Sequence, residues 1–158
     1  MIPDGLVLGA GVAEWVADQT GATGHHQPVG IGWARGGEIV AGCMFVNYSG
    51  ASIDAHIAVR PGTMMAKTWV AAIIDYPFKQ VKVRRVTCLI DERNTACRGF
   101  VEHLGARCEG LLKDALPDGN LMVYGFLKYD AQKWLTASFQ RLLTGDGNGQ
   151  EKQPAASA

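Results

Sequence analysis

Two polar side chains near the middle of the chain are the first candidates for proton-transfer chemistry. Over residues 52–60, apolar and polar residues alternate, which indicates a strand with one polar face. Asp54 and His56 stand two residues apart, so we expect them to share that face. An imidazole titrates near neutral pH, and His56 is therefore our first candidate for a general base. Asp54 is the second and Glu38 the third, while a hydrogen-bonded strand histidine and an exposed carboxylate are the structural alternatives.

Asn94 and Cys97 stand at the start of a helical pattern that runs to Leu104. Asn is among the best N-cap residues, which is a sufficient structural explanation for Asn94. Cys97 lies where a helix dipole can lower the pKa of a thiol, so a nucleophilic role is one interpretation. The alternative is that Cys97 fills a packed position as a small apolar residue.

The other histidines and cysteines do not form a metal-binding pattern. His25 and His26 are adjacent but have no further ligands nearby, which favours a solvated loop. The four cysteines, at positions 43, 88, 97 and 108, include no C-x-x-C pair, so we expect reduced thiols in a cytoplasmic protein and no metal site. Arg84 and Arg85 suggest a basic patch, but neighbouring side chains on a strand point to opposite faces, so no single nucleic-acid-binding surface is expected.

The elements that must position these residues follow from periodicity and turn signals. The helices are expected at residues 11–20, 64–76 (closed by Pro77), 94–104 (stopped by Gly105) and from Asp130 onward. The strands are expected at residues 28–34, 38–48, 52–60, 82–90, 107–113 and 120–129, with hairpin turns at Arg35-Gly36-Gly37 and Pro117-Asp118-Gly119-Asn120. This order predicts an α/β (α+β) fold in a single domain, residues 1–143, with a disordered tail at residues 144–158.

Composition excludes several classes of protein. Fifteen basic residues balance fifteen acidic ones, so binding of nucleic acid through bulk charge is not expected. No apolar run reaches the length of about 20 residues that a membrane span needs, and the first residues lack the basic start of a signal peptide. The 20 glycines among 158 residues are well above the usual share, which predicts many turns and close backbone approaches.

Residues 94–110, NTACRGFVEHLGARCEG, resemble the late motif of the GCN5-related N-acetyltransferases, in particular the ribosomal-protein acetyltransferase branch and small phage-borne relatives. That motif reads roughly N-x-x-[SA], an apolar helix face, and L-G-F-x-x-E-G; Cys97, His103 and Ala106 depart from its usual residues. The likeness extends over about residues 8–135. It implies a central, mixed, mostly antiparallel twisted sheet of six to seven strands flanked by helices.

The resemblance also implies a binding site for acetyl-coenzyme A. The thioester would meet backbone N–H groups near Ile57, Ala58 and Val59. The family's pyrophosphate loop, [QR]-x-x-G-x-[GA], corresponds to the loop of residues 59–67, VRPGTMMAK. Arg60 and Gly62 are its candidate residues there, while the second glycine is missing and the bulky Met64 and Met65 stand where a close approach is needed. The further residues implied for the coenzyme are Thr63 as N-cap, Lys67 as a phosphate contact and Asn94 on the pantetheine arm. Val101 stands where the family often has a tyrosine acid.

Three functions remain open at this point. The first is an N-acetyltransferase that transfers an acetyl group from acetyl-coenzyme A directly to a primary amine of a small molecule or protein. The second is a non-catalytic binding or accessory module, perhaps carried by a phage, that keeps the fold but has lost the coenzyme loop. The third transfers another group to a nucleobase. A homodimer is compatible with each of them.

Overall fold

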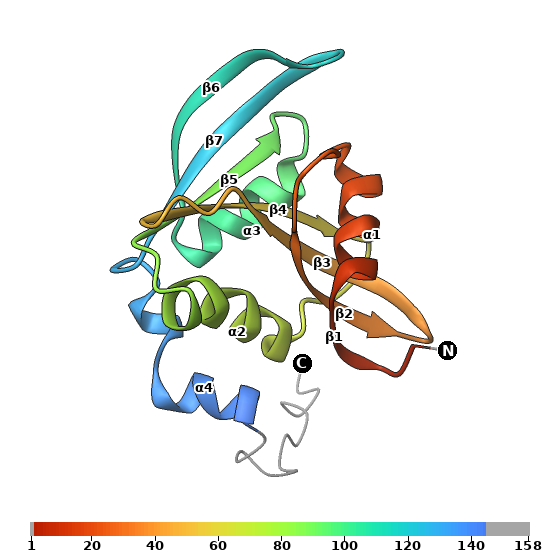
Figure 1. The fold of residues 1–158 in the computed structure, drawn as a ribbon, viewed down its shortest axis with the longest axis vertical. Coiled ribbons are helices and arrows are strands. Elements are labelled where there is room, and N and C mark those ends of the chain that lie inside the picture. The colour runs from red at the N-terminus through yellow and green to blue at the C-terminus, as the bar shows by residue number, and fades with distance from the viewer. Residues whose placement is uncertain (1, 145–158) are drawn as a thin grey trace.

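The computed structural model describes residues 2–144, which form one seven-stranded sheet with helices on both faces (Figure 1). The strands are β1 (Gly5–Leu8), β2 (Val29–Arg35), β3 (Glu38–Val46), β4 (Ser52–Val59), β5 (Arg85–Asp91), β6 (Arg107–Leu116) and β7 (Gly119–Leu127). Their order across the sheet is β1-β2-β3-β4-β5-β7-β6, and only the pair β4–β5 is parallel. The expected mixed, mostly antiparallel sheet is confirmed.

Helix α1 (Ala10–Thr20) covers one face of β2, β3 and β4, and glycines let it lie close to the strands. A Cβ atom placed on Gly30 would lie 2.6 Å from the carbonyl oxygen of Gly9 and 2.7 Å from the backbone nitrogen of Ala13. A Cβ atom on Gly42 would lie 2.7 Å from a methyl group of Val16. Real Cβ atoms do not approach this closely, so these positions require glycine. The expected close backbone approaches are thus found beneath α1.

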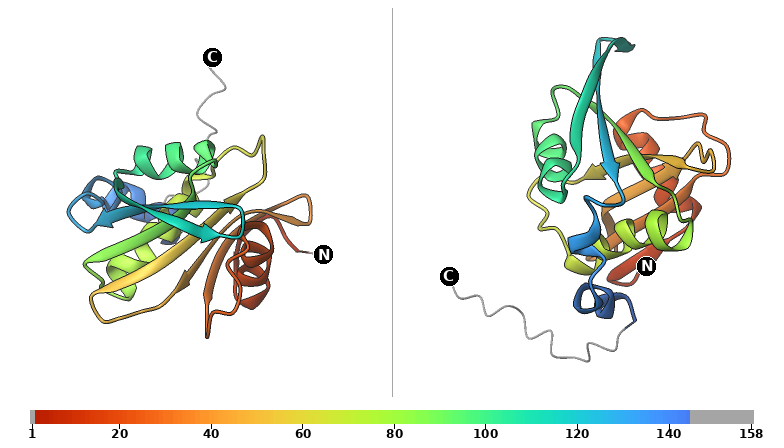
Figure 2. Two further views of the ribbon diagram at one scale, coloured as in Figure 1. Left: turned by 90° about the horizontal axis from the view of Figure 1, so that it is seen from above. Right: turned by 90° about the vertical axis from the view of Figure 1, so that its left-hand side faces the viewer.

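The opposite face carries α2 (Lys67–Asp75), α3 (Thr95–Leu104) and α4 (Ala137–Thr144), and α1 and α3 lie on different sides of the sheet in Figure 2. Trp69 of α2 is fully buried, donates a hydrogen bond from Nε1 to the carbonyl oxygen of Ile31 at 3.0 Å, and stacks on Phe100 of α3. Such buried aromatic contacts fix the two helices against the sheet. Met64, in the loop before α2, is 79% exposed.

Both expected hairpins are present. Arg35 pairs with Glu38, so the β2–β3 loop is Gly36-Gly37 rather than three residues. Both glycines have positive φ, 63° and 82°, as a type I′ turn requires. The β6–β7 hairpin turns between Leu116 and Gly119, and its tip extends beyond the rest of the sheet in Figure 1.

Three elements differ from the prediction. Strand β1 was not expected, because its four residues are too few for a periodic pattern. Pro77 does not close the second helix: a π-helical turn, Tyr76–Gln80, follows α2 directly, and Val81 donates to the carbonyl oxygen of Tyr76. Proline tolerates the first turn of a helix because the N–H it lacks would be unpaired there. The last helix is broken into a 3-10 turn, Gln132–Trp134, and α4.

The expected tail at residues 144–158 lies outside the described residues, except for Thr144, which ends α4. Among the residues described, no helix is long and apolar enough to cross a bilayer.

Candidate functional site

Strands β4 and β5 run together at their starts and then separate, which opens the sheet in its middle. The parallel register covers Ser52↔Arg85 to Ala55↔Cys88 and ends there. Beyond it, β4 continues its pairing with β3 alone, through Val59↔Ala41. The second half of β4 therefore presents one backbone edge to a gap instead of to a neighbouring strand.

Backbone N–H groups of Ile57 and Val59 are directed at this gap. The N–H of Arg60 donates to the carbonyl oxygen of Val40 on β3 at 2.9 Å, and successive residues of a strand direct their backbone groups to alternate sides. Ala58 therefore faces β3, and Ile57 and Val59 face β5, with no ladder partner there. Of the three residues expected to bind a thioester oxygen, two are positioned to donate to a ligand and the third is not.

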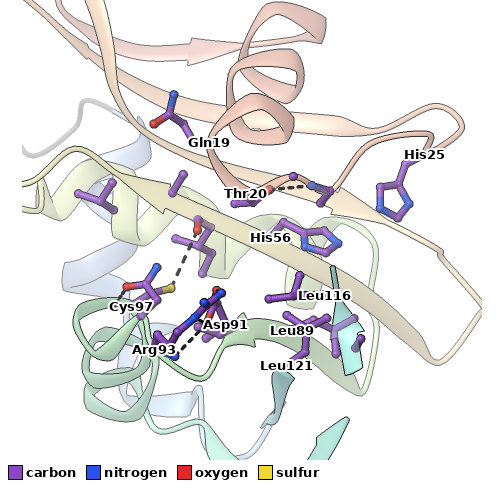
Figure 3. Close-up of a pocket in the computed structure, with 18 of the residues that line it drawn as sticks. Gln19, Thr20, His25, His56, Leu89, Asp91, Arg93, Cys97, Leu116 and Leu121 are labelled. Carbon is purple, nitrogen blue, oxygen red and sulfur yellow. Dashed lines mark hydrogen bonds and ion pairs between the residues drawn. The ribbon is translucent and has the colours of Figure 1, made fainter. Parts of the chain in front are cut away.

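A cavity of about 600 Å³ occupies the gap and passes from the face covered by α1 to the start of α3 (Figure 3). Its walls come from the end of α1 and the following loop, from β4 and β5, from the start of α3 and from the β6–β7 hairpin. The lining residues are Gln19, Thr20, Gly21, Ala22, His25, Asn47, His56, Ile57, Ala58, Val59, Leu89, Ile90, Asp91, Arg93, Asn94, Cys97, Ala115, Leu116 and Leu121.

His56 lies in the wall of this cavity. It directly precedes Ile57 in β4, and the N–H groups of Ile57 and Val59 are the two that face the gap. The side chain of His56 is buried, being 8% exposed, and its ring centroid lies 5.2 Å from that of His25. Burial lowers the pKa of His56, the neighbouring His25 lowers it further, and Asp54 raises it. His56 is therefore neutral near pH 7 and able to accept a proton.

His25 is the residue that sequence reasoning missed. Its position in a glycine-bounded loop favoured a solvated side chain, but the loop folds back over β4 and brings the ring to His56. The adjacent histidines His25 and His26 favoured a solvated loop, and nothing in the sequence indicated that one of them contacts a distant strand. Among the described residues, no group of three metal-ligating side chains is found.

The two carboxylates proposed beside His56 do not line the cavity. Asp54 shares a strand face with His56 but accepts a hydrogen bond from Asn47 Nδ2 at 3.0 Å. Glu38 forms an ion pair with Arg60 at 2.5 Å, at the far end of β4. The structure therefore does not bring Asp54 or Glu38 into the cavity beside His56.

The start of α3 closes the other end of the cavity. Asn94 is the N-cap, as expected, and its side-chain oxygen accepts a hydrogen bond from the N–H of Cys97 at 3.0 Å. Its amide nitrogen therefore keeps its donors for a ligand. Of the two interpretations of Cys97, the structure favours the packed position, because burial raises the pKa of this thiol to about 11. Cys97 is thus a protonated packing residue.

Helix α3 contains no tyrosine, and among the described residues no tyrosine lines the cavity. The family's tyrosine position is Val101, which is buried in the core. Tyr124 is also buried, and its hydroxyl accepts from Arg98 Nε at 3.0 Å and donates to Glu102 Oε1 at 2.6 Å. Tyr129 is 65% exposed and does not line the cavity.

The loop between β4 and α2 retains part of an anion-binding arrangement. Arg60 to Thr63 form a turn closed by a 3.1 Å hydrogen bond from Thr63 N–H to the Arg60 carbonyl, with Gly62 at a φ of 79°. The N-cap of α2 is Ala66, not Thr63, and no side chain caps it. The N–H groups of Lys67 and the two residues after it are therefore unpaired within the helix and available to a phosphate. Backbone donors of this kind are the type that binds a pyrophosphate.

Arg93 lies at the edge of the cavity, between two carboxylates. It forms hydrogen-bonded ion pairs with Asp91 at 2.7 Å and with Asp118 at 3.2 Å. Hydrogen bonds from Arg93 lower the pKa of Asp91 to about 2. Asp91 is therefore ionised at neutral pH, and its carboxylate is ion-paired with Arg93.

The basic pair Arg84 and Arg85 lies at the start of β5. Strand β5 begins at Arg85, so Arg84 precedes it, and both residues line a shallow hollow with Lys128 at the other end of the sheet. The absence of a single nucleic-acid-binding surface at these residues stays a prediction.

No model of a protein family matches this sequence, and no curated protein matches it either. Solved structures do share its fold. The spermidine/spermine N-acetyltransferase from Vibrio cholerae aligns over 81% of this chain and 96% of its own, with a TM-score of 0.64 and 12% identity. A putative acetyltransferase aligns over 80% and 70% of the two chains, at a TM-score of 0.59 and 22% identity.

A ribosomal-protein-S5-alanine acetyltransferase from Vibrio fischeri aligns over 63% and 61%, at a TM-score of 0.57 and 15% identity. The chain therefore has the fold of the GCN5-related N-acetyltransferases.

Proposed function

From this fold and this cavity, we propose that the protein is an N-acetyltransferase that uses acetyl-coenzyme A and acetylates a primary amine by direct transfer. The observation that supports it most strongly is the separation of β4 from β5. It leaves the N–H groups of Ile57 and Val59 free at a cavity whose wall also holds the neutral imidazole of His56.

Acetyl-coenzyme A supplies an acetyl group activated as a thioester. The unpaired donors at the start of α2, with Arg60 and Lys67, would hold its pyrophosphate, and the amide of Asn94 would hold its pantetheine arm. Acyl transfer develops negative charge on the carbonyl oxygen, and preorganised backbone donors stabilise such charge more than water does. Ile57 and Val59 offer these donors without any loss of sheet pairing.

Transfer forms an amide bond, so one proton must leave the amine and one must reach the departing sulfur. His56 is the group positioned to take the first proton, because burial and His25 keep its imidazole neutral. Among the described residues, no tyrosine at the cavity offers the second, since Val101 holds that position. The cavity is open, and water can therefore supply it.

The direct test is release of free thiol from acetyl-coenzyme A in the presence of a panel of primary amines. We expect amine-dependent release that falls at least about a hundredfold in His56→Ala, the usual scale for a lost general base. His26→Ala is the matched control, since His26 is exposed and does not line the cavity. Equal loss in both variants, or no release with any amine, would contradict the proposal.

A non-catalytic module is the second candidate function. The observation that favours it is the coenzyme loop, where exposed Met64 and the neighbouring Met65 replace the family's second glycine. In that case the fold would persist without binding acetyl-coenzyme A, and a binding measurement separates the two functions.

A further inference from the structure

A second hollow lies at the end of the sheet away from the gap. Its volume is about 520 Å³, which is in the range of sites for small molecules, and it forms where β4 and β5 begin and β7 ends. Ser52, which starts β4, lines this hollow, whereas Val59, which ends β4, lines the cavity in the gap. The two places share no lining residue, so the hollow is separate from the candidate coenzyme site.

Basic side chains line the hollow, and no carboxylate does. One of them, Arg85, is already matched, because it donates two hydrogen bonds to the carboxylate of Glu109. The other two, Arg84 and Lys128, are exposed and have no ion-pair partner in the part of the chain that the structure describes. Within that part of the chain, the hollow therefore carries the unmatched positive charges of Arg84 and Lys128.

Arg84 and Lys128 are also direct neighbours. The register Arg85↔Leu127 places Arg84 opposite Lys128, and the N–H of Lys128 donates to the carbonyl oxygen of Arg84 at 3.1 Å. Like charges that stand opposite each other on adjacent strands destabilise a sheet. An anion bound between the two side chains relieves this repulsion, so the arrangement favours an anionic ligand.

The hollow matches one kind of anion in particular. A phosphate monoester carries close to two negative charges at neutral pH, and a guanidinium and an ammonium group both bind phosphate oxygens. Ser52 adds a hydroxyl group to the same wall. Tyr129, the residue after Lys128, also lines the hollow and is 65% exposed. An exposed aromatic ring is a surface on which a nucleobase can stack.

We propose that this hollow binds a nucleoside monophosphate, with the phosphate between Arg84 and Lys128 and the base on the ring of Tyr129. The two positive charges match a terminal phosphate better than the single charge of each phosphate inside a nucleic-acid chain. The ligand is therefore a small molecule. The proposal does not rest on acetyl transfer.

Calorimetric titration with adenosine monophosphate (AMP) tests the site. We expect AMP to bind about tenfold or more tightly than adenosine, which lacks the phosphate. Arg84→Gln and Lys128→Gln each remove one charge and should each weaken AMP binding about fivefold or more. Adenosine that binds as tightly as AMP would overturn the proposal, and this comparison remains decisive if a variant does not fold.

Two further variants locate the bound AMP. Lys113→Gln is the matched control and should keep the parent affinity, because Lys113 is exposed and lines neither the hollow nor the cavity. Coenzyme A contains an adenine nucleotide, so AMP could bind at the coenzyme loop instead, and Arg60→Gln reports that location. A larger loss in Arg60→Gln than in Arg84→Gln, or an equal loss in Lys113→Gln, would overturn the proposal.

The place of the base has its own test. AMP should bind several-fold more tightly than ribose 5-phosphate, which lacks a base, and Tyr129→Leu should remove that preference. Tyr48→Leu is the control, because Tyr48 is 59% exposed and does not line the hollow. An unchanged preference in Tyr129→Leu would contradict stacking on Tyr129. An oligonucleotide without a terminal phosphate that binds as tightly as AMP would show that the surface takes nucleic acid, and would overturn the proposal.

Discussion

The imidazole rings of His25 and His56 lie 5.2 Å apart between centroids, although the two residues are 31 positions apart in the chain and belong to a loop and a strand. The contact has an electrostatic consequence. A proton on His56 would be buried and would face a second basic ring, so the pKa of His56 is lowered by both effects. The neutral form that catalysis needs is thus the form that the fold favours.

Removal of His25 should move the pH profile of the reaction. In His25→Ala, His56 loses a basic neighbour and gains access to water, and both changes raise its pKa toward the ordinary value. Because the proton-free form is active, the acid limb of kcat/KM should shift to higher pH, by about half a unit or more. His26→Ala should leave the limb in place. A shift to lower pH in His25→Ala, or none, would show that the pair does not set the pKa.

Asn94 has two roles that substitution can separate. Asn94→Ala removes both the cap and the amide donors, so it should destabilise the protein by about 1 kcal/mol and weaken coenzyme binding. Asn94→Ser keeps an oxygen for the Cys97 N–H but lacks the amide donors. It should therefore melt near the parent temperature and still bind coenzyme more weakly. Parent affinity in Asn94→Ser would confine the residue to capping.

The ion pair between Glu38 and Arg60 places a carboxylate beside the loop that we assign to the coenzyme phosphates. Glu38→Gln removes that charge and frees the guanidinium, so affinity for coenzyme A should rise about two- to fivefold at low salt. The rise should shrink at high salt. Glu14→Gln, on the exposed side of α1, is the matched control. Weaker binding in Glu38→Gln would mean that Arg60 needs its partner for position.

Glycine at position 30 lets α1 lie against the sheet, and this contact is testable by adding one methyl group. Gly30→Ala would place Cβ 2.6 Å from a backbone oxygen, which cannot move easily, and should destabilise the protein by about 1–3 kcal/mol. Gly99→Ala, inside α3 with open space around it, should stabilise by about 0.5–1 kcal/mol. Denaturant unfolding of both variants gives the two free energies. A neutral Gly30→Ala would contradict the close packing of α1.

Local signals in the sequence predicted the elements whose ends are marked by a capping residue or by glycine. The N-cap Asn94 and the stop at Gly105 bound α3 as expected, and the hairpin glycines mark the β2–β3 turn. Strand β1 was missed because it depends on pairing with β2, which is distant in sequence. The π-helical turn at Pro77 could not be foreseen from a residue that usually ends helices.

Only the part of the candidate site that lies on β4 could be predicted from the sequence. The alternating pattern predicted the strand that carries His56, Ile57 and Val59, and the resemblance implied that backbone N–H groups of this strand meet the thioester. Long-range contacts decided the rest: the loop that brings His25 to His56, the hairpin that brings Leu116 and Leu121, and the ion pair that holds Glu38 at Arg60. Burial also decided between the two interpretations of Cys97, because the dipole argument omits the cost of desolvation.

The central claim is that the gap between β4 and β5 binds acetyl-coenzyme A, and calorimetric titration of the purified protein with this coenzyme tests it most directly. We predict a dissociation constant in the micromolar range, weakened in Asn94→Ser. Absence of binding at millimolar coenzyme would contradict the account and leave a protein that keeps the acetyltransferase fold for another purpose.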